Sequence, residues 1–296
     1  MAGLVEAEIF RALGALSETP TPELQQVADL LGLGQLPDRA AHGELFLFQL
    51  YPYASVYLGA EGMMGGEAAD RIAGFWRALG QTPPAEPDHL AIMLGLHAHL
   101  GELERQAADV PARERWRHAR GAFLWEHLLS WLPVFLMKLG DLREPGGAED
   151  CFYQRWAALL GEALRAEAAA LPPPGSRLPL HLRAAPGCVD PRRDGLQGFL
   201  GSLLTPVRSG IVLVRADLAR AARELGLGLR QGERRLVLKA LFEQDPGPVL
   251  GWLAREAAAW AGRHRPEVPA AAPLVAFWQD RAEATARLLS ELRADL

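Results

Sequence analysis

The spacing of apolar residues is the feature that most restricts the fold of this chain. Through most of the 296 residues, apolar side chains recur at intervals of three and four, which matches the 3.6-residue turn of an α-helix. In residues 4–17, for example, Ile9, Leu13 and Leu16 fall near one face, away from the charged positions. Alternating runs with hairpin turns are nearly absent, and only residues 211–214 (IVLV) resemble a strand. The pattern predicts an all-α protein built as a helical bundle.

Proline and glycine divide this pattern into separate helices. The segments with a helical period are residues 4–17, 21–33, 67–80, 87–110, 112–140, 148–171, 196–210, 215–226, 232–244, 246–264 and 273–296. Pro133 predicts a break or kink inside one of these segments, and Pro52 interrupts the aromatic-rich residues 43–59. The glycine-rich residues 60–68 predict a loop between helices, with a flexible hinge as the alternative.

The distribution of charge divides the chain at a segment rich in proline and glycine. Residues 1–170 contain 13 Lys and Arg against 23 Asp and Glu, a balance of −10, whereas residues 171–296 contain 18 against 13, a balance of +5. Residues 171–195, LPPPGSRLPLHLRAAPGCVDPRRDG, cannot form one helix. We therefore expect an acidic helical domain at 1–170, a linker at 171–195 and a basic helical region of unknown role at 196–296.

Features of secretion and membrane insertion are absent from the sequence. Cys151 and Cys188 form neither a disulfide framework nor a CxxC pair, which fits a reducing compartment. The N-terminus lacks the basic and apolar regions of a secretory signal. The longest apolar run, FLWEHLLSWLPVFLMKL, is broken by Glu126, His127 and Pro133, so it is unsuited to a bilayer span. We expect a cytoplasmic protein that does not insert into membranes.

The common catalytic and cofactor-binding motifs are also absent. The sequence contains no GxSxG, HExxH, GxGxxG or GxxxxGK[ST]. His89, His97 and His99 fall in one expected helix, but no two of them are four residues apart, and His97 and His99 point to opposite sides. A helical enzyme or metal protein using these histidines is the least favoured hypothesis, and we expect no enzyme, no metal and no cofactor.

A basic stretch supplies a second hypothesis, which is DNA binding. Between Arg192 and Lys239, ten Lys and Arg stand against four acidic residues, and residues 216–242 can be aligned with a helix-turn-helix. However, Gly232 occupies a position where the recognition helix needs an apolar residue, and the acidic chain as a whole repels nucleic acid. A solvated helical face is the favoured interpretation, and we expect no nucleic-acid partner. A helical regulator with a C-terminal DNA-binding segment is kept as the alternative function.

Residues 83–94, PPAEPDHLAIML, place Glu86, Asp88 and His89 at the start of an apolar helix. Pro87 suits a first helical turn, and Glu86 or Asp88 can accept backbone N–H groups and interact favourably with the helix dipole. Helix capping therefore explains the stretch from the residues alone. Recognition of a ligand is the alternative.

This stretch resembles a motif of the TorD/DmsD/NarJ family of redox-enzyme maturation chaperones. Members carry a signature of the type E-x-x-DH or E-P-x-DH in a loop that opens a helix, and the matching residues here are Glu86, Pro87, Asp88 and His89. Upstream, LFLFQLYPYASVYLGAEG resembles an aromatic, Tyr- and Pro-containing region of the family, and downstream FLWEHLLSWLPVFLMKL resembles a later helix. The resemblance covers roughly residues 1–170.

The chain departs from the family pattern at three points. Met93 stands where many members have a glutamate, and Leu96–His97 stands where many have a Phe-Met pair. The chain is also longer than most members, so its last ~120 residues lie outside the common pattern.

The resemblance implies an all-helical cytoplasmic chaperone rather than an enzyme. Members bind the twin-arginine signal peptide or the core of a molybdopterin oxidoreductase precursor, and they hold it until the cofactor is inserted, before export. Molybdopterin belongs to that client, so the resemblance implies no cofactor for this chain. Some members have been linked to guanine nucleotides, for which this sequence shows no site. The identity of the client and the question of a homodimer stay open.

Two chemical features suit the binding of such a peptide. Arginine pairs with carboxylates through two directed hydrogen bonds, so Glu86 and Asp88 are candidate partners in an acidic domain, and His89 can orient the loop or add a pH-sensitive contact. An aromatic groove would hold the apolar part of the peptide, although aromatic residues at this spacing are more often core residues. The expected peptide-binding residues are Glu86, Asp88, His89, Tyr51, Tyr53, Tyr57, Trp76 and Glu126.

Overall fold

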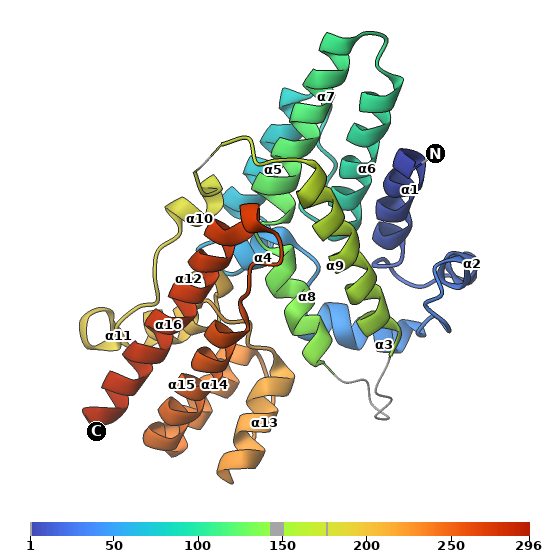
Figure 1. Cartoon of the computed structure of the whole chain (residues 1–296). Helices are drawn as coiled ribbons and strands as arrows, with labels where there is room; N and C mark the ends of the chain where they lie inside the picture. The colour runs from blue at the N-terminus through green and yellow to red at the C-terminus, as the bar shows by residue number, and fades with distance from the viewer. Residues whose placement is uncertain (1, 143–150, 176) are drawn as a thin grey trace. The chain divides into compact units, whose positions relative to one another are not determined.

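The computed structural model describes residues 2–142, 151–175 and 177–296, which form helices joined by loops (Figure 1). No β-strand occurs among these residues, and an isolated antiparallel bridge joins Tyr53 to His89. The all-α prediction is therefore confirmed. Residues 211–214, the only strand-like run, lie buried between two helices. Their apolar character reflects burial of the whole backbone segment and not pairing in a sheet.

The chain forms two compact units. The N-terminal unit contains Met1–Ser55 and Met64–His181, and the C-terminal unit contains Val56–Met63 and Leu182–Leu296. A short segment from the first sixty-odd residues therefore clusters with the C-terminal unit. The predicted linker, residues 171–195, contains a short helix and the start of a longer one. The predicted three-part division of the chain stays a prediction.

Helices make up most of the N-terminal unit. In chain order they are α1 (Ala2–Ala15), α2 (Pro22–Leu30), α3 (Arg39–Gly43), the π-helical η1 (Glu44–Gln49), α4 (Ala54–Leu58), α5 (Gly66–Ala78), α6 (Leu90–Gln106), α7 (Val110–Phe123), the π-helical η2 (Leu124–Leu128), α8 (Leu132–Asp141), α9 (Phe152–Ala170) and α10 (Leu180–Ala184). The boundaries between the two units fall within α4 and α10. The segment 112–140 is thus broken as Pro133 predicts, because α8 begins beside that proline. The break also includes η2, which the sequence pattern did not indicate.

Large aromatic side chains fill the core of the N-terminal unit. Trp131, Trp156 and Phe123 are completely buried. Such rings contribute much of the apolar area removed from water, at about 25 cal/mol per Å². The indole of Trp156 also donates a 3.0 Å hydrogen bond to the Leu13 carbonyl, which fixes α9 against α1. Packing of α1 on α6 and of α6 on α7 completes this part of the bundle (Figure 1).

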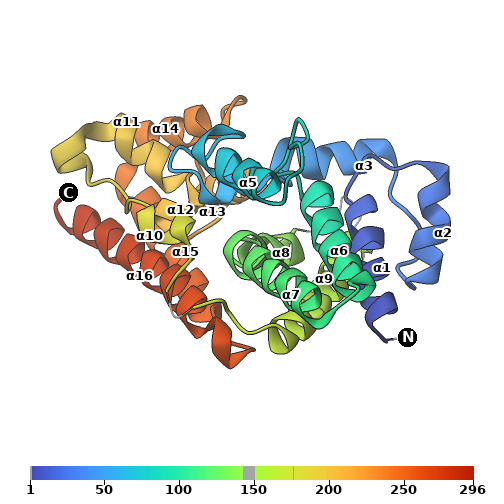
Figure 2. The same cartoon turned by 90° about the horizontal axis from the view of Figure 1, so that it is seen from above.

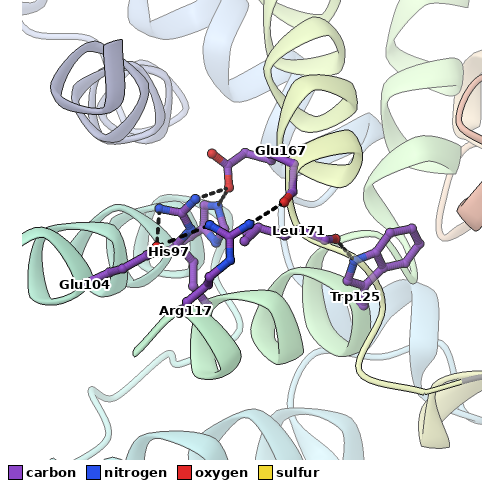
Figure 3. Close-up of polar contacts among 8 residues, drawn as sticks. His97, Glu104, Arg117, Trp125, Glu167 and Leu171 are labelled. Atoms are coloured by element: carbon purple, nitrogen blue, oxygen red, sulfur yellow. Dashed lines mark hydrogen bonds and ion pairs between the residues drawn. The ribbon is translucent and has the colours of Figure 1, made fainter. Parts of the chain in front are cut away.

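A buried network of charged groups joins α6, α7 and α9 (Figure 3). His97 Nε2 lies 3.0 Å from Glu167 Oε2, and Arg120 lies 3.4 Å from the same oxygen and 3.1 Å from Glu104. Burial alone would raise the pKa of Glu167, but its bond to His97 and the nearby arginines outweigh that effect, so the pKa is lowered. The network pairs buried ionisable groups that would otherwise destabilise the fold.

The C-terminal unit continues with helices of very different lengths. They are α11 (Pro191–Leu203), α12 (Pro206–Ser209), α13 (Arg215–Leu225), α14 (Arg234–Gln244), α15 (Pro246–Arg263), the 3-10 turn η3 (Pro269–Ala271) and α16 (Ala272–Ala294). The two longest, α15 and α16, pack side by side, as both views show (Figure 1 and Figure 2). Gly210 ends α12 with φ +74°, and a Cβ atom there would lie 2.2 Å from the Ala282 backbone nitrogen of α16. Only glycine permits this close approach.

Within the described part of the chain, no helix combines the length and the apolar composition that a bilayer span requires.

Candidate functional site

The EPDH loop, residues 86–89, lies against the backbone of residues 52–55. Leu90 N donates a 2.8 Å hydrogen bond to the Pro52 carbonyl, and Ala54 N donates a 3.0 Å bond to the Asp88 carbonyl. These two bonds flank the bridge between Tyr53 and His89. The loop that opens α6 is thereby fixed to the start of α4.

Asp88 points into the protein and binds the backbone of this neighbouring segment. Its side chain is 3% exposed, and Oδ2 accepts a 3.1 Å hydrogen bond from Ser55 N. Asp88 therefore satisfies the free N–H groups at the start of α4, where a carboxylate also meets the favourable end of the backbone dipoles. Pairing of Asp88 with a peptide arginine would require it to leave this position.

The residue that caps the N-terminus of α6 is not one of those predicted from the sequence. The N-cap residue is His89, whose Nδ1 accepts a 3.3 Å hydrogen bond from Ala91 N. We expected Glu86 or Asp88 to cap this helix, and that expectation was wrong because Asp88 is used by Ser55 and Glu86 by Tyr53. Acceptance at Nδ1 leaves the other ring nitrogen, Nε2, as the proton-bearing donor.

The accessible part of the candidate site consists of Glu86 and His89 of the loop and the neighbouring Tyr53. Glu86 is exposed, and its Oε2 accepts a 3.1 Å hydrogen bond from the Tyr53 hydroxyl. The ring of Tyr53 meets the imidazole of His89 edge to face, with 4.9 Å between ring centroids. One carboxylate oxygen of Glu86 is thus oriented by a tyrosine, and the other is free of any such bond to the loop.

The protonation states of this group follow from its surroundings. Burial, together with the bond to Glu86, raises the pKa of Tyr53 to about 12, so the hydroxyl stays a donor at neutral pH. Burial lowers the pKa of His89, and the nearby carboxylates of Glu18, Glu86 and Asp88 only partly oppose that shift. His89 must be neutral to accept a hydrogen bond at Nδ1, and the lowered pKa agrees with that. Within the group of Tyr53, Glu86 and His89, the charge is therefore carried by the exposed carboxylate of Glu86.

The other aromatic residues predicted for the site have different surroundings. Tyr51 is half-buried beside Pro52, and Trp76 is half-buried on α5. Tyr57 is 1% exposed and clusters with the C-terminal unit, where burial strongly raises its pKa. A peptide cannot reach the ring of Tyr57 in this structure, so it acts from the core.

Glu126 fixes the chain downstream of α9. Its Oε1 accepts a 2.5 Å hydrogen bond from Leu180 N, and the neighbouring His127 lies 3.3 Å from His181 through their ring nitrogens. Trp125, just before Glu126, donates to the Leu171 carbonyl at 2.6 Å (Figure 3). Three successive residues of η2 therefore hold both ends of residues 171–181.

The three histidines considered for a metal site have separate environments. His97 pairs with buried Glu167, His99 is partly exposed beside Glu102 at 3.6 Å, and His89 caps α6. The described residues contain no group of three His, Cys, Asp or Glu side chains arranged to hold a metal ion.

The helix-turn-helix alternative is not favoured by the geometry. α13 ends at Leu225 and α14 begins at Arg234, so residues 226–233 separate them. This connection is longer than the turn of about 3–4 residues in that motif. Arg234 and Arg235 also donate to backbone carbonyls within the C-terminal unit, at 2.6 and 2.8 Å.

Ser55 is the residue of this site that the sequence did not indicate. It is fully buried, and its backbone N–H binds a carboxylate 33 residues away. A contact between residues so distant in sequence leaves no periodicity or spacing that the sequence could show. The family resemblance indicated only the Tyr- and Pro-containing segment in which Ser55 lies.

Comparisons with known proteins agree on one group. The family model described as nitrate reductase delta subunit matches residues 13–137, a range that includes the EPDH loop and residues 52–55. A protein named chaperone protein TorD from Vibrio vulnificus strain YJ016 is 31% identical over 161 residues, which cover 49% of this chain and 70% of the relative. Proteins of the same name from Vibrio cholerae O1 strain O395 and Vibrio parahaemolyticus O3:K6 are 30% and 28% identical, covering 43% and 53% of this chain and 56% and 77% of the relatives. No solved structure matches the chain significantly.

Proposed function

Because this chain belongs to the TorD/NarJ family of molybdoenzyme chaperones, we propose that it binds the twin-arginine signal peptide of a molybdoenzyme precursor at the EPDH loop. The family and the relatives are chaperones and not enzymes. In the proposed role, the chain holds the precursor in the cytoplasm until molybdopterin has been inserted, before export. The cofactor belongs to the client throughout.

The observation that carries this proposal is the exposed carboxylate of Glu86 held in place by Tyr53. A guanidinium group needs two acceptor positions in one plane, and a carboxylate whose orientation is already fixed loses less side-chain freedom on binding. The aromatic ring of Tyr53 lies beside this carboxylate, and in the proposal a face of that ring receives the second guanidinium.

The other residues predicted for the site take different roles in this proposal. Asp88 is a positioning residue, because its carboxylate holds the loop to Ser55 from inside the protein. Tyr51 and Trp76 are half-buried and are proposed as peripheral contacts. Tyr57 and Glu126 support the fold, the first from the core and the second through Leu180.

Isothermal titration with synthetic signal peptides tests the proposal. The peptides are those of the twin-arginine molybdoenzyme precursors encoded in the same genome, each paired with a version in which both arginines are lysines. We expect Glu86→Gln to weaken binding of the arginine peptide by slightly more than tenfold, since a charge-assisted hydrogen bond contributes about 1.5 kcal/mol or more. The lysine peptide should bind the wild-type chain more weakly, because an ammonium group cannot form the bidentate pair.

Glu114→Gln is the matched control, because Glu114 is an exposed glutamate of the same unit on α7. It removes the same charge and should leave the dissociation constant unchanged. If both variants weaken binding equally, the unit attracts the peptide only through its overall charge. If no twin-arginine peptide binds the wild-type chain, the proposed function is wrong.

A further inference from the structure

Met64 is a large exposed apolar residue next to Gly65, which hydrogen-bonds to Ser55. It is 58% exposed and lies in the N-terminal unit, within the glycine-rich residues 60–68 and just before α5. Its neighbour Met63 is exposed as well but clusters with the C-terminal unit, so the inference concerns Met64 alone. Most of the apolar surface of this methionine is left in contact with water, which is unfavourable.

The backbone beside Met64 is fixed to the residue that also holds the EPDH loop. Gly65, the next residue, has φ +83° and donates a 3.0 Å hydrogen bond to the Ser55 hydroxyl. The backbone N–H of the same Ser55 donates to Asp88. Ser55 therefore binds the methionine-bearing loop through its side chain and the EPDH loop through its main chain.

These contacts place Met64 and Glu86 within reach of one short peptide. Glu86 is connected to this serine twice, through Tyr53 two residues earlier and through Asp88. A peptide in extended form spans about 3.3 Å per residue, so a few residues suffice to cover both side chains. The flexible, polarizable thioether of a methionine suits the binding of apolar segments of variable sequence.

A signal peptide carries its positive charges before its apolar region, so one such peptide presents both chemistries in a fixed order. Resting on the proposed function, we propose that Met64 contacts the apolar region of the twin-arginine signal peptide while Glu86 binds its arginines. The site then selects for two properties at once, since a basic peptide without an apolar region uses only Glu86. An apolar peptide without arginines uses only Met64.

A double-mutant cycle tests this pairing in the full-length chain. The protein variants are wild type, Met64→Ser and Met64→Leu. The probes are the twin-arginine peptides used to test Glu86 and versions whose apolar region is replaced by serine and glutamine with the arginines kept. We expect Met64→Ser to weaken binding of the native peptide about five- to tenfold, the effect of exposing part of a methionine-sized contact.

The same change should alter binding of the polar peptide by less than about twofold, because its partner is already missing. Met64→Leu should stay within about twofold of wild type with both peptides. Leu30→Ser is the matched control, since Leu30 is an 87% exposed apolar residue of the same unit at the end of α2. It should change neither affinity.

Four outcomes would overturn the inference. Equal weakening of both peptides by Met64→Ser would show a structural effect on the loop. An effect of Leu30→Ser as large as that of Met64→Ser would show general surface adhesion. Unchanged affinity in Met64→Ser, with Glu86→Gln still weakening binding, would remove Met64 from the site and leave the proposed function in place. Absence of any binding to wild type would refute the proposed function and this inference together.

Discussion

Replacing Asp88 by alanine should destabilise the N-terminal unit far more than an ordinary loss of a surface carboxylate. The Ser55 N–H is buried and has Asp88 Oδ2 as its acceptor at 3.1 Å. Alanine leaves this donor without a partner and away from water. The unmet donor costs about 1–3 kcal/mol, and loss of a bond to an ionised acceptor lies at the upper part of that range. We expect about 2–3 kcal/mol.

Asparagine at the same position separates the hydrogen bond from the charge. Its amide oxygen can still accept from Ser55 N, so Asp88→Asn should cost only about 1 kcal/mol, the difference between a charged and a neutral acceptor. In a unit of this size each kcal/mol shifts the melting temperature by about 2–4 °C. The alanine variant should therefore melt about 4–12 °C lower and the asparagine variant about 2–4 °C lower.

Asp109→Ala is the matched control. Asp109 caps α7 by accepting a 2.7 Å hydrogen bond from Ala112 N, but it is exposed, so water can replace the lost acceptor. It should cost about 1 kcal/mol. Thermal and urea unfolding give the stabilities, and hydrogen exchange at the Ser55 amide shows whether the local bond is lost. A melting temperature of Asp88→Ala within about 1 °C of wild type, with Ser55 still protected, would refute the reasoning.

Two further predictions follow from buried groups in the two units. Burial lowers the pKa of His127 to about 3 and of His181 to about 4, so the unfolded state binds protons first as pH falls below about 6.5. The free energy of unfolding should then fall from pH 6.5 towards pH 4, by at most about 1.4 kcal/mol per pH unit for each histidine. When both histidines are replaced by glutamine, the free energy of unfolding measured with urea should depend less on pH. An unchanged pH dependence in the double variant would contradict this prediction. Gly210→Ala should lower the free energy of unfolding by at least about 3 kcal/mol in thermal melts, because its Cβ atom would overlap the Ala282 backbone. Gly226 also has a positive φ, +68°, but no atom lies within 4 Å of the position of a Cβ atom, so Gly226→Ala should cost about 1 kcal/mol. Equal effects of the two alanines would show that backbone conformation, and not the close approach, is decisive.

The sequence predicted the helices well because each one carries its own signal. A helix that covers a core repeats apolar residues on one face, and proline or glycine marks its ends, so both signals are local. Pro133 shows the point, since α8 begins beside it. The π-helical η1 and η2 were not predicted, because one extra residue per turn is set by packing and leaves no distinct pattern. The clustering of Val56–Met63 with the C-terminal unit likewise depends on contacts distant in sequence.

For the candidate site, the sequence indicated residues that could form it but not the contacts that those residues make. The motif and the resemblance identified Glu86, Asp88 and His89, and Tyr53 nearby. Their partners could not be predicted, because Asp88 reaches a backbone N–H 33 residues away and His89 then takes the cap of α6. His97 gives a similar case. The sequence did not favour it as a metal ligand but could not identify its partner, which is a buried carboxylate 70 residues away.

The charge of the N-terminal unit is a poor guide to which carboxylate binds a peptide. Several of its acidic groups are already paired with its own arginines, among them Glu102 with Arg11 and Glu104 with Arg120. Exposed charges more than about 10 Å apart are also largely screened at physiological salt. Glu86 differs because its oriented partner is the neutral hydroxyl of Tyr53, so its negative charge is not neutralised by that contact. On the proposed function, selection of an arginine pair therefore depends on the geometry of one loop, which Asp88 and Ser55 hold in place, more than on the net charge of the unit.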